Sequence, residues 1–324
     1  MFKCLWSAVA VAVGLAGSPI QAQEAFPSRP IRVVVPFAPG SSIDFLLRVI
    51  SERFQQSTGM PLVIDNRGGG GGVLAADHVR TAAPDGYTLM AATVGQMSVN
   101  PYTRVKLPYD PERSFAPITQ LVTSQYVFIA HPSVPATDLK GFIAWAKTNP
   151  GKVSYASTGA GLPGHFAGVM LSQAAGLDLI HVPFKGGGPA MNDLLGGHVN
   201  TFFATVGIAG DTLKSDKVRV FAVTSPQRVL SLPDVPTFTE LSYPGVVATV
   251  WSGLVAPAGT PQPILDKLNR EMVAALKHPD SIQKLRATDQ EPVGSSISEF
   301  TAFLKADRER WQAAVKASGF KATE

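Results

Sequence analysis

The sequence has 324 residues, of which 45% are hydrophobic and 16% are charged. This balance is typical of a globular protein of about two domains, and it excludes a disordered chain and a polytopic membrane protein. The 28 basic and 24 acidic residues give a formal net charge of +4, and because the basic residues are scattered, we expect no nucleic-acid partner.

The first residues predict an export signal. A short basic start ending at Lys3 precedes an apolar run from Leu5 to Gly17, and small residues follow up to Ala22. A run of about 13 apolar residues is too short to span a bilayer as a stable helix, but it suits a secretory signal peptide. We expect cleavage near Ala22 and a periplasmic mature protein; the alternative is a buried N-terminal helix. The only cysteine, Cys4, lies in this segment, which excludes a disulfide framework and a cysteine-based metal site.

Beyond this segment, short β-branched runs alternate with helical periods, as is typical of a parallel α/β architecture. In chain order, we expect strands at 31–35, 62–64, 87–92, 126–130, 153–157, 179–182, 199–203 and 218–224. Helices are expected from Ile43 onward and over 73–82, 139–147 and 164–175. After Pro263 the pattern predicts helices almost throughout, with Phe300, Leu304 and Trp311 on one apolar packing face.

These two α/β sets predict two lobes that face each other across a cleft. We place the late helices with the first lobe, so the chain crosses between the lobes near 121–124 and again near 224–226, as in a hinged binding protein. We therefore expect a signal peptide at 1–22, a first domain formed by 23–123 with 225–324, and a second domain at 124–224.

Four loops join a strand to a helix through small residues, where unpaired N–H groups offer an anion site. In the first, Ser41 can cap the helix, and Asp44 fits a first-turn residue better than an acid catalyst. A capped turn without a ligand is the alternative.

In the second loop, five glycines follow Arg67 and can either approach a ligand closely or form a flexible hinge. Arg67 fits a structural salt bridge better than a ligand contact.

The third loop, at 157–165, contains G-x-G-x-x-G between a strand and a helix, which is the dinucleotide-binding fingerprint in its usual context. Its position in mid-chain, Pro163 within the turn and the export signal favour a generic anion site instead. His165 is either a polar contact of the second lobe or a structural histidine. The fourth loop carries Lys185, which could set a preference for anions or lie solvated at the surface.

Standard catalytic and metal-binding patterns are absent from the sequence. It contains no G-x-S-x-G, no G-x-x-x-x-G-K-[ST] and no H-E-x-x-H. The six histidines are dispersed, with no pair at the spacing of metal ligands. A Ser-His-Asp arrangement formed only in space stays open as an alternative, but we expect no enzymatic activity, no cofactor and no metal.

Seven motifs, taken in order, resemble the Bug family, the periplasmic substrate-binding proteins of tripartite tricarboxylate transporters. They span essentially the whole mature chain and read PIRVVVPFAPG (30–40), DNRGG (65–69), APDGYTL (83–89), LPYD (107–110), HVPFKG (181–186), LPDVPT (232–237) and APAGTP (256–261). The resemblance implies an α/β periplasmic-binding-protein fold of the second type, whose two lobes close like a Venus flytrap on one small organic anion.

The resemblance also implies the ligand-binding residues. Backbone amides of the first loop are expected to hold a ligand carboxylate, and the second lobe is expected to close over the other end. Carried over by motif, the residues are Phe37, Ala38, Gly40, Ser41, Gly71, Gly72 and Thr93 in the first lobe, and Ser157, Thr158, His165, Lys185 and Ala204 in the second.

Three positions depart from the usual pattern of the family. Ser41 replaces a second glycine, Gly68 replaces a proline, and Ala204 with Thr205 stands where an aspartate that can pair with a ligand amine is common. An amino-acid ligand is therefore disfavoured, and we expect a di- or tricarboxylate or an aromatic carboxylate. We expect a monomeric receptor that delivers this ligand to the membrane subunits of a tripartite tricarboxylate transporter. The alternative is a binding protein that reports its ligand to a membrane sensor kinase.

Overall fold

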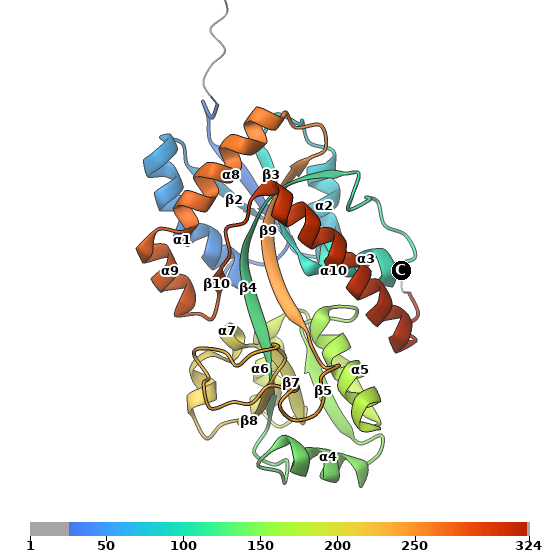
Figure 1. The fold of residues 1–324 in the computed structure, drawn as a ribbon. Helices are drawn as coiled ribbons and strands as arrows, with labels where there is room; N and C mark the ends of the chain where they lie inside the picture. Colours follow the sequence, from blue (N-terminus) through green and yellow to red (C-terminus); the bar gives the residue numbers. More distant parts are fainter. Residues whose placement is uncertain (1–25, 323–324) are drawn as a thin grey trace, which may run out of the picture.

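The structure, a computed structural model, describes residues 26–322, so the predicted signal peptide and its cleavage near Ala22 lie outside the described residues. Two α/β lobes, an upper and a lower one, are joined by long strands (Figure 1). One mixed sheet runs through both lobes in the strand order β2-β1-β3-β9-β4-β7-β5-β6, and β8 and β10 also pair with β4. The predicted α/β architecture is confirmed.

The upper lobe contains the parallel strands of the N-terminal region and the late helices. Its strands are β1 (Ile31–Val35), β2 (Leu62–Asn66), β3 (Thr88–Thr93), β9 (Thr249–Pro257), β10 (Glu291–Pro292) and the first part of β4 (Phe115–Ala130). Its helices are α1 (Ser42–Thr58), α2 (Val73–Arg80), α3 (Asn100–Thr103), α8 (Gln262–Leu276), α9 (Pro279–Arg286) and α10 (Ile297–Ser318). Strand β1 pairs in parallel with β2 and β3, and β9 runs antiparallel between β3 and β4.

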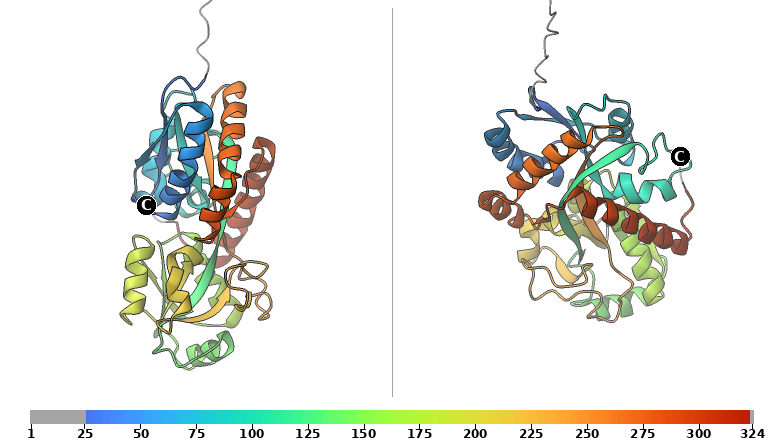
Figure 2. Two further views of the ribbon diagram at one scale, coloured as in Figure 1. Left: turned by 90° about the vertical axis from the view of Figure 1, so that its left-hand side faces the viewer. Right: turned by 45° about the horizontal axis from the view of Figure 1, so that its top comes forward.

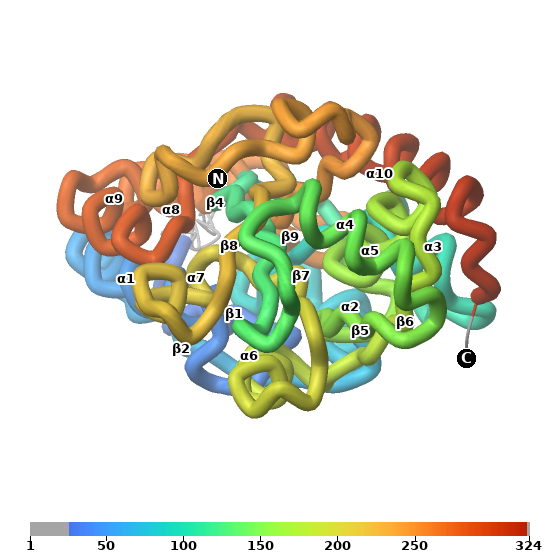
Figure 3. Tube along the Cα trace, turned by 90° about the horizontal axis from the view of Figure 1, so that it is seen from below, coloured from blue at the N-terminus to red at the C-terminus, as the bar shows by residue number. Residues whose placement is uncertain are grey.

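The helices of the upper lobe cover both faces of its sheet. Helices α1 and α8 pack side by side, burying Phe54 and Leu268 in one apolar cluster, and their adjacency is visible in Figure 2. Helix α10 buries Phe300 and Trp311 in a second cluster, which confirms the predicted packing face. Seen from below, the end of α10 lies beside α3 and α5 (Figure 3).

The lower lobe contains the second α/β set. Its strands are the end of β4 with β5 (Val153–Ser157), β6 (Leu179–Pro183), β7 (Thr201–Thr205) and β8 (Arg219–Val223), and its helices are α4 (Leu139–Lys147), α5 (Pro163–Ala175), α6 (Gly187–Leu195) and α7 (Val206–Ala209). Strand β5 pairs in parallel with β6 and β7. The core is aromatic, because Phe128 stacks on Phe203 with ring centroids 4.5 Å apart and meets Phe142 edge-on at 5.1 Å.

Strand β4 carries the chain from the upper to the lower lobe, close to the predicted 121–124. Its residues 115–125 pair with β9, and its residues 126–130 pair with β7. The return differs from the prediction at 224–226. Phe238 and Val246 pack in the lower-lobe core with Phe128, so residues 225–248 stay with the lower lobe, and the chain returns only at the start of β9. The burial of these two apolar side chains in the lower lobe stabilises the segment there.

Several elements have no counterpart among the predicted ones. They are the first part of β4, strands β9 and β10, and the short helices α3 and α7. Two irregular turns follow strands of the upper lobe, the 3₁₀ turn η1 (Gly70–Gly72) and the π-helical turn η2 (Gly95–Val99). A third irregular turn, η3 (Gly210–Lys214), follows α7. Within residues 26–322, no helix combines the length and apolar character that crossing a membrane requires.

Candidate functional site

The loops that follow the parallel strands of both lobes meet where the lobes touch, and we call this region the junction. A Cβ atom on Gly95, just after β3, would lie 3.3 Å from Cδ2 of Leu162, just before α5. A Cβ atom on Gly161 would lie 3.4 Å from the side chain of Thr103 in α3. Ligands of open α/β sheets bind at the carboxyl ends of the strands, so the junction is the candidate site.

The first loop, between β1 and α1, is a tight turn held by its own polar groups. Ser41 caps α1, because its Oγ accepts a hydrogen bond of 3.3 Å from the Asp44 amide. The buried Asp44 carboxylate accepts from the Gly40 amide at 3.1 Å and from Nε of Arg48 at 2.9 Å. The Arg48 hydrogen bond holds the pKa of Asp44 below its usual value. The predicted capping by Ser41 and first-turn place of Asp44 are confirmed, whereas the Gly40 amide is already engaged within the protein.

The first loop rests on the segment that follows β2. Nδ2 of Asn66 donates to the Phe37 carbonyl at 3.2 Å, and a Cβ atom on Gly68 would lie 3.4 Å from the Ala38 nitrogen. Arg67 pairs with Asp65 at 3.0 Å, which confirms the salt bridge predicted for it. Phe37 is half-buried and Ala38 is exposed, so this segment supports the loop from one side and leaves it accessible from the other.

The glycine-rich segment at 68–72, called here the glycine loop, is held by side chains of η2 and α3. The Gly71 carbonyl accepts from Nε2 of Gln96 and Nδ2 of Asn100, each at 3.1 Å, and the Gly70 carbonyl accepts from Arg104 at 3.1 Å. Thr93 donates its amide and hydroxyl to Oε1 of Gln96. The structure therefore brings three of the predicted residues, Gly71, Gly72 and Thr93, close together. They surround Gln96, a residue that the sequence motifs did not indicate.

A stacked pair of histidines lies under the loop that follows β5. The rings of His165 and His181 are 3.8 Å apart, and Ser157 Oγ is 2.7 Å from Nε2 of His181. Nδ1 of His165 accepts from the Gly161 amide at 3.1 Å. Burial lowers the pKa of His165 to about 4, and burial with the neighbouring His165 lowers the pKa of His181 to about 3. Both rings are therefore neutral at pH 7.

Ser157 and His181 are as close as a catalytic nucleophile and its general base, but they share no other property with such a pair. A general base works best with a pKa near the operating pH, and the pKa of His181 lies far below it. The side chain of Ser157 is completely buried, so a substrate has no access to it. The geometry gives the pair a structural role, holding the loop that carries Gly161 and Leu162, and it favours the structural alternative for His165.

The other predicted residues of the lower lobe lie in different surroundings. The Thr158 side chain and the Gly164 amide hydrogen-bond to the Tyr126 hydroxyl, whose pKa is raised by burial. Ala204 is fully buried inside β7, in the apolar cluster behind the sheet. Lys185 is exposed in the loop that precedes α6. Thr158 is thus in the loop at the junction, Ala204 presents no side chain to it, and Lys185 fits the solvated alternative.

A second contact between the lobes lies beside α7 and the end of α9, on the other side of the molecule from α5 and α10 (Figure 1). Ser231 donates its hydroxyl to the Asp289 carboxylate. A Cβ atom on Gly207 would lie 2.7 Å from the Thr288 carbonyl oxygen. Burial raises the pKa of Asp289 to about 6, opposed by the nearby charge of Lys214. The lobes are therefore in contact at both sides of the junction.

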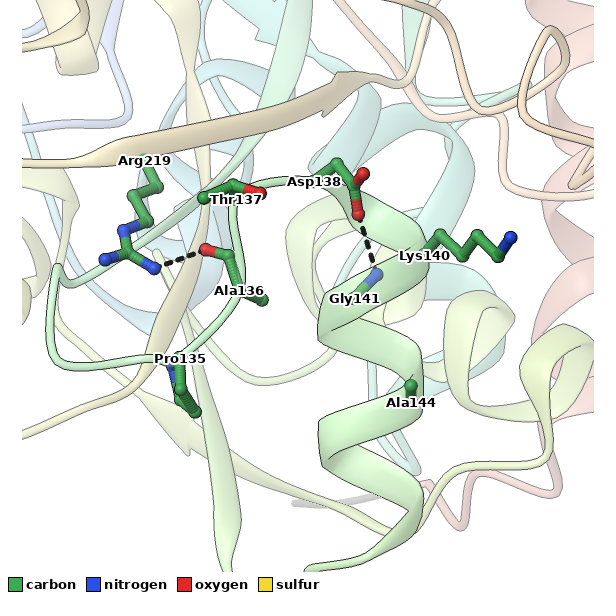
Figure 4. A pocket seen from close by; sticks show the side chains of 8 residues that line it. All are labelled: Pro135, Ala136, Thr137, Asp138, Lys140, Gly141, Ala144 and Arg219. Atoms are coloured by element: carbon green, nitrogen blue, oxygen red, sulfur yellow. Dashed lines mark hydrogen bonds between the residues drawn. The ribbon is translucent and has the colours of Figure 1, made fainter.

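A hollow on the lower lobe lies apart from the junction, between the loop before α4 and strand β8 (Figure 4). Arg219 donates to the carbonyls of Val134 and Ala136 at 2.5 Å each, and Asp138 caps α4 by accepting from Gly141 at 2.7 Å. These charged groups hold the loop, so we assign no ligand to the hollow. Among residues 26–322, no group of three or more histidine, cysteine or acidic side chains is arranged to hold a metal ion.

Known proteins share this fold and are similar to this chain in sequence. A family model described as "Tripartite tricarboxylate transporter family receptor" matches residues 46–320. The periplasmic binding protein BugD is 34% identical, with a TM-score of 0.84 over 92% of this chain and 100% of BugD. Rpa4515 of R. palustris, solved with adipate, is 30% identical, with a TM-score of 0.87 over 92% and 100% of the two chains. MatC of Rhodopseudomonas palustris, solved with bound malate, is 32% identical, with a TM-score of 0.82 over 90% and 100%.

Proposed function

Because the chain belongs to the tripartite tricarboxylate transporter receptor family, we propose that it is a periplasmic receptor that closes on a small organic dicarboxylate. The predicted Bug-family resemblance and periplasmic-binding fold are confirmed, since the family model covers most of the chain and BugD shares its architecture. The family consists of receptors, and capture and release require no covalent step.

The observation that carries this proposal is the meeting of strand-end loops from both lobes at the junction. The meeting is seen between Gly95 after β3 and Leu162 before α5. We propose that the first loop, with Phe37, Ala38 and Ser41, and the lower-lobe loop with Thr158 form the site beside it. A binding site divided between two lobes favours closure when a ligand bridges them. The two similar proteins solved with adipate and with malate hold dicarboxylates, and this supports the same ligand class here.

The partners follow from the proposed role. A receptor that releases its ligand unchanged needs a membrane acceptor, and we assign this role to the membrane subunits of a tripartite tricarboxylate transporter. We divide the chain into an upper lobe of residues 26–125 with 249–322 and a lower lobe of residues 126–248. The family model describes receptors of this transporter, which favours transport over the sensing alternative.

A thermal-shift screen tests the proposal. The protein would be measured with C4 to C8 dicarboxylates, citrate and benzoate, after unfolding and refolding to remove any ligand carried through purification. A ligand present at about a thousand times its dissociation constant adds about 4 kcal/mol to the free energy of unfolding. We expect a shift of several degrees for one or more dicarboxylates, and no shift with any carboxylate would refute the proposal.

A matched pair of threonine variants locates the site. Thr158→Ala changes the loop at the junction, whereas Thr137→Ala changes the hollow shown in Figure 4. Each removes one hydroxyl from a side chain that is not fully buried. We expect the dicarboxylate shift to shrink only for Thr158→Ala. An equal shrinkage for both variants would place the ligand elsewhere.

A further inference from the structure

Gln96 connects two separate segments of the upper lobe at the junction, the end of β3 and the glycine loop. Its Oε1 accepts from the amide of Thr93 at 3.0 Å and from the hydroxyl of Thr93 at 2.5 Å, while its Nε2 donates to the Gly71 carbonyl at 3.1 Å. The side chain is 1% exposed. Gln96 thereby ties the end of β3 to the glycine loop, with both ends of one amide in use.

The side chain of Gln96 lies directly against the backbone of Gly72. A Cβ atom on Gly72 would lie 1.8 Å from Nε2 of Gln96, so a side chain at position 72 would occupy the space of the amide. The backbone of Gly72 also has a φ of 86°, which other residues rarely adopt. The glycine at this position therefore leaves room for the side chain of Gln96.

Two further donors follow Gln96 along the chain at helical spacing. Asn100 donates to the same Gly71 carbonyl, and Arg104 donates to the Gly70 carbonyl. Gln96 in η2, Asn100 at the start of α3 and Arg104 just after α3 therefore all donate to carbonyl groups of the glycine loop. A flexible glycine run is thus fixed by side chains from outside it, in contrast to the hinge alternative considered from the sequence.

The fixed glycine loop in turn bears on the predicted ligand loop. Its first residue, Gly68, lies against the backbone of Phe37 and Ala38. On the other side, a Cβ atom on Gly95 would lie 3.5 Å from Thr93 Oγ1, 4.0 Å from the Gly71 carbonyl oxygen and 3.3 Å from Leu162 of the lower lobe. The network around Gln96 therefore lies between the first loop and the surface on which the lower lobe closes.

We propose that Gln96, assisted by Asn100, is a positioning residue that holds the glycine loop in the shape required for dicarboxylate binding at the junction. The expected effect of Gln96 on ligand affinity rests on the proposed function, whereas its effect on the shape of the glycine loop does not. Gln96 makes its contacts within the protein and acts on the ligand through the glycine loop and the first loop.

The first measurement compares Gln96→Glu with a matched control, Val99→Ala. Glutamate keeps the size of the side chain but loses the donor to the Gly71 carbonyl, whereas Val99→Ala trims a buried side chain of the same turn. Amide hydrogen exchange would be followed in peptides covering residues 67–73. We expect exchange there to accelerate about tenfold or more in Gln96→Glu and to stay near the wild-type rate in Val99→Ala, as expected for a lost buried hydrogen bond.

A pH series separates positioning from general loss of structure. A buried carboxyl group beside a carbonyl has a raised pKa, and once protonated it regains a donor. We expect the ratio of exchange rates, Gln96→Glu over wild type, to fall toward one as the pH is lowered from 8 to 5. If the ratio is the same at both pH values, or if it equals that of Val99→Ala, the positioning role is refuted. Should Gln96→Glu fail to fold, Asn100→Ala removes one of the two donors to Gly71 and is expected to give a smaller acceleration at the same residues.

Calorimetric titration with adipate gives the second readout. We expect Gln96→Glu to bind adipate about tenfold or more weakly than wild type at pH 8, and Val99→Ala to bind it as wild type does. Unchanged affinity in Gln96→Glu would overturn the link to binding. If wild type binds no carboxylate, the proposed function fails, while the exchange measurement still decides whether Gln96 positions the loop.

Discussion

Gly95 lies where the upper lobe touches Leu162 of the lower lobe, and we predict that a side chain at this position hinders closure of the lobes. A Cβ atom there would lie 3.3 Å from Cδ2 of Leu162 across the junction, and the γ-methyl groups of valine would extend beyond it. Overpacking of a well-packed contact costs about 1–3 kcal/mol, and 1.4 kcal/mol is tenfold in affinity, so Gly95→Val should weaken dicarboxylate binding about 5- to 150-fold. The penalty applies only when the lobes are closed, so the melting temperature of the unliganded protein should fall much less.

The assay is calorimetric titration with adipate and malate on a double-mutant cycle. Leu162→Ala removes the opposing side chain, so Gly95→Val in that background should cost little affinity. Gly188→Val is a control, because a Cβ atom at Gly188 meets nothing within 4 Å. If Gly95→Val weakens binding equally with Leu162 and with alanine at position 162, the contact across the junction is not the cause and the reasoning is refuted.

Three further predictions concern titratable groups. Folding lowers the pKa of His165 from 6.5 to about 4 and that of His181 to about 3, so the unfolded chain binds more protons and stability should decline as the pH falls from 6.5 to 4, by up to about 1.4 kcal/mol per pH unit for each ring. Chemical denaturation across this range should show a flatter decline in His181→Phe, and an identical profile would contradict this. Burial raises the pKa of Asp289 from 3.8 to about 6, so the charged carboxylate lowers stability at pH 7.5. Asp289→Asn should therefore raise the melting temperature at pH 7.5 and lose that gain below pH 3.8. A gain independent of pH would show that the charge of Asp289 is not responsible. Asp307 accepts from Nε1 of Trp251 at 2.8 Å in the core, so Asp307→Leu should lower the free energy of unfolding by about 1–3 kcal/mol by leaving the indole unpaired, and an unchanged value would show that the hydrogen bond contributes nothing.

The regular elements could be predicted because their patterns are local. The run at Ile31–Val35 and the helical period from Ile43 to Phe54 each have the spacing that burial on one face requires, and the structure places them in β1 and α1. The cap by Ser41 and the salt bridge of Arg67 were also predictable, because their partners, Asp44 and Asp65, lie within three residues in the sequence.

The rest depends on contacts between distant segments. The point at which the chain returns to the upper lobe could not be predicted from residues 225–248. Phe238 and Val246 are buried in the same cluster as Phe128, and such a contact between distant segments produces no helical or strand periodicity in the sequence. Ala204 was placed at the site on the expectation that β7 ends at Phe203, but the strand continues to Thr205, which leaves Ala204 in the core.

The organisation of the glycine loop escaped prediction because its partners lie in an irregular turn. Gln96 follows β3 in a π-helical segment, where the usual periods fail. One signal was available in the sequence: Gln96, Asn100 and Arg104 are hydrogen-bond donors spaced four apart directly after a buried strand. The structure shows all three donating to carbonyl groups of the glycine loop.

Calorimetric titration of the refolded wild-type protein with the best dicarboxylate of the thermal-shift screen tests the central claim most directly. The account predicts one binding site per chain, and a negative heat-capacity change because closure of the lobes buries apolar surface. It also predicts weaker binding by Thr158→Ala and unchanged binding by Thr137→Ala. Absence of saturable binding, or a loss of affinity that is the same for both variants, would contradict a carboxylate receptor whose site lies between the lobes.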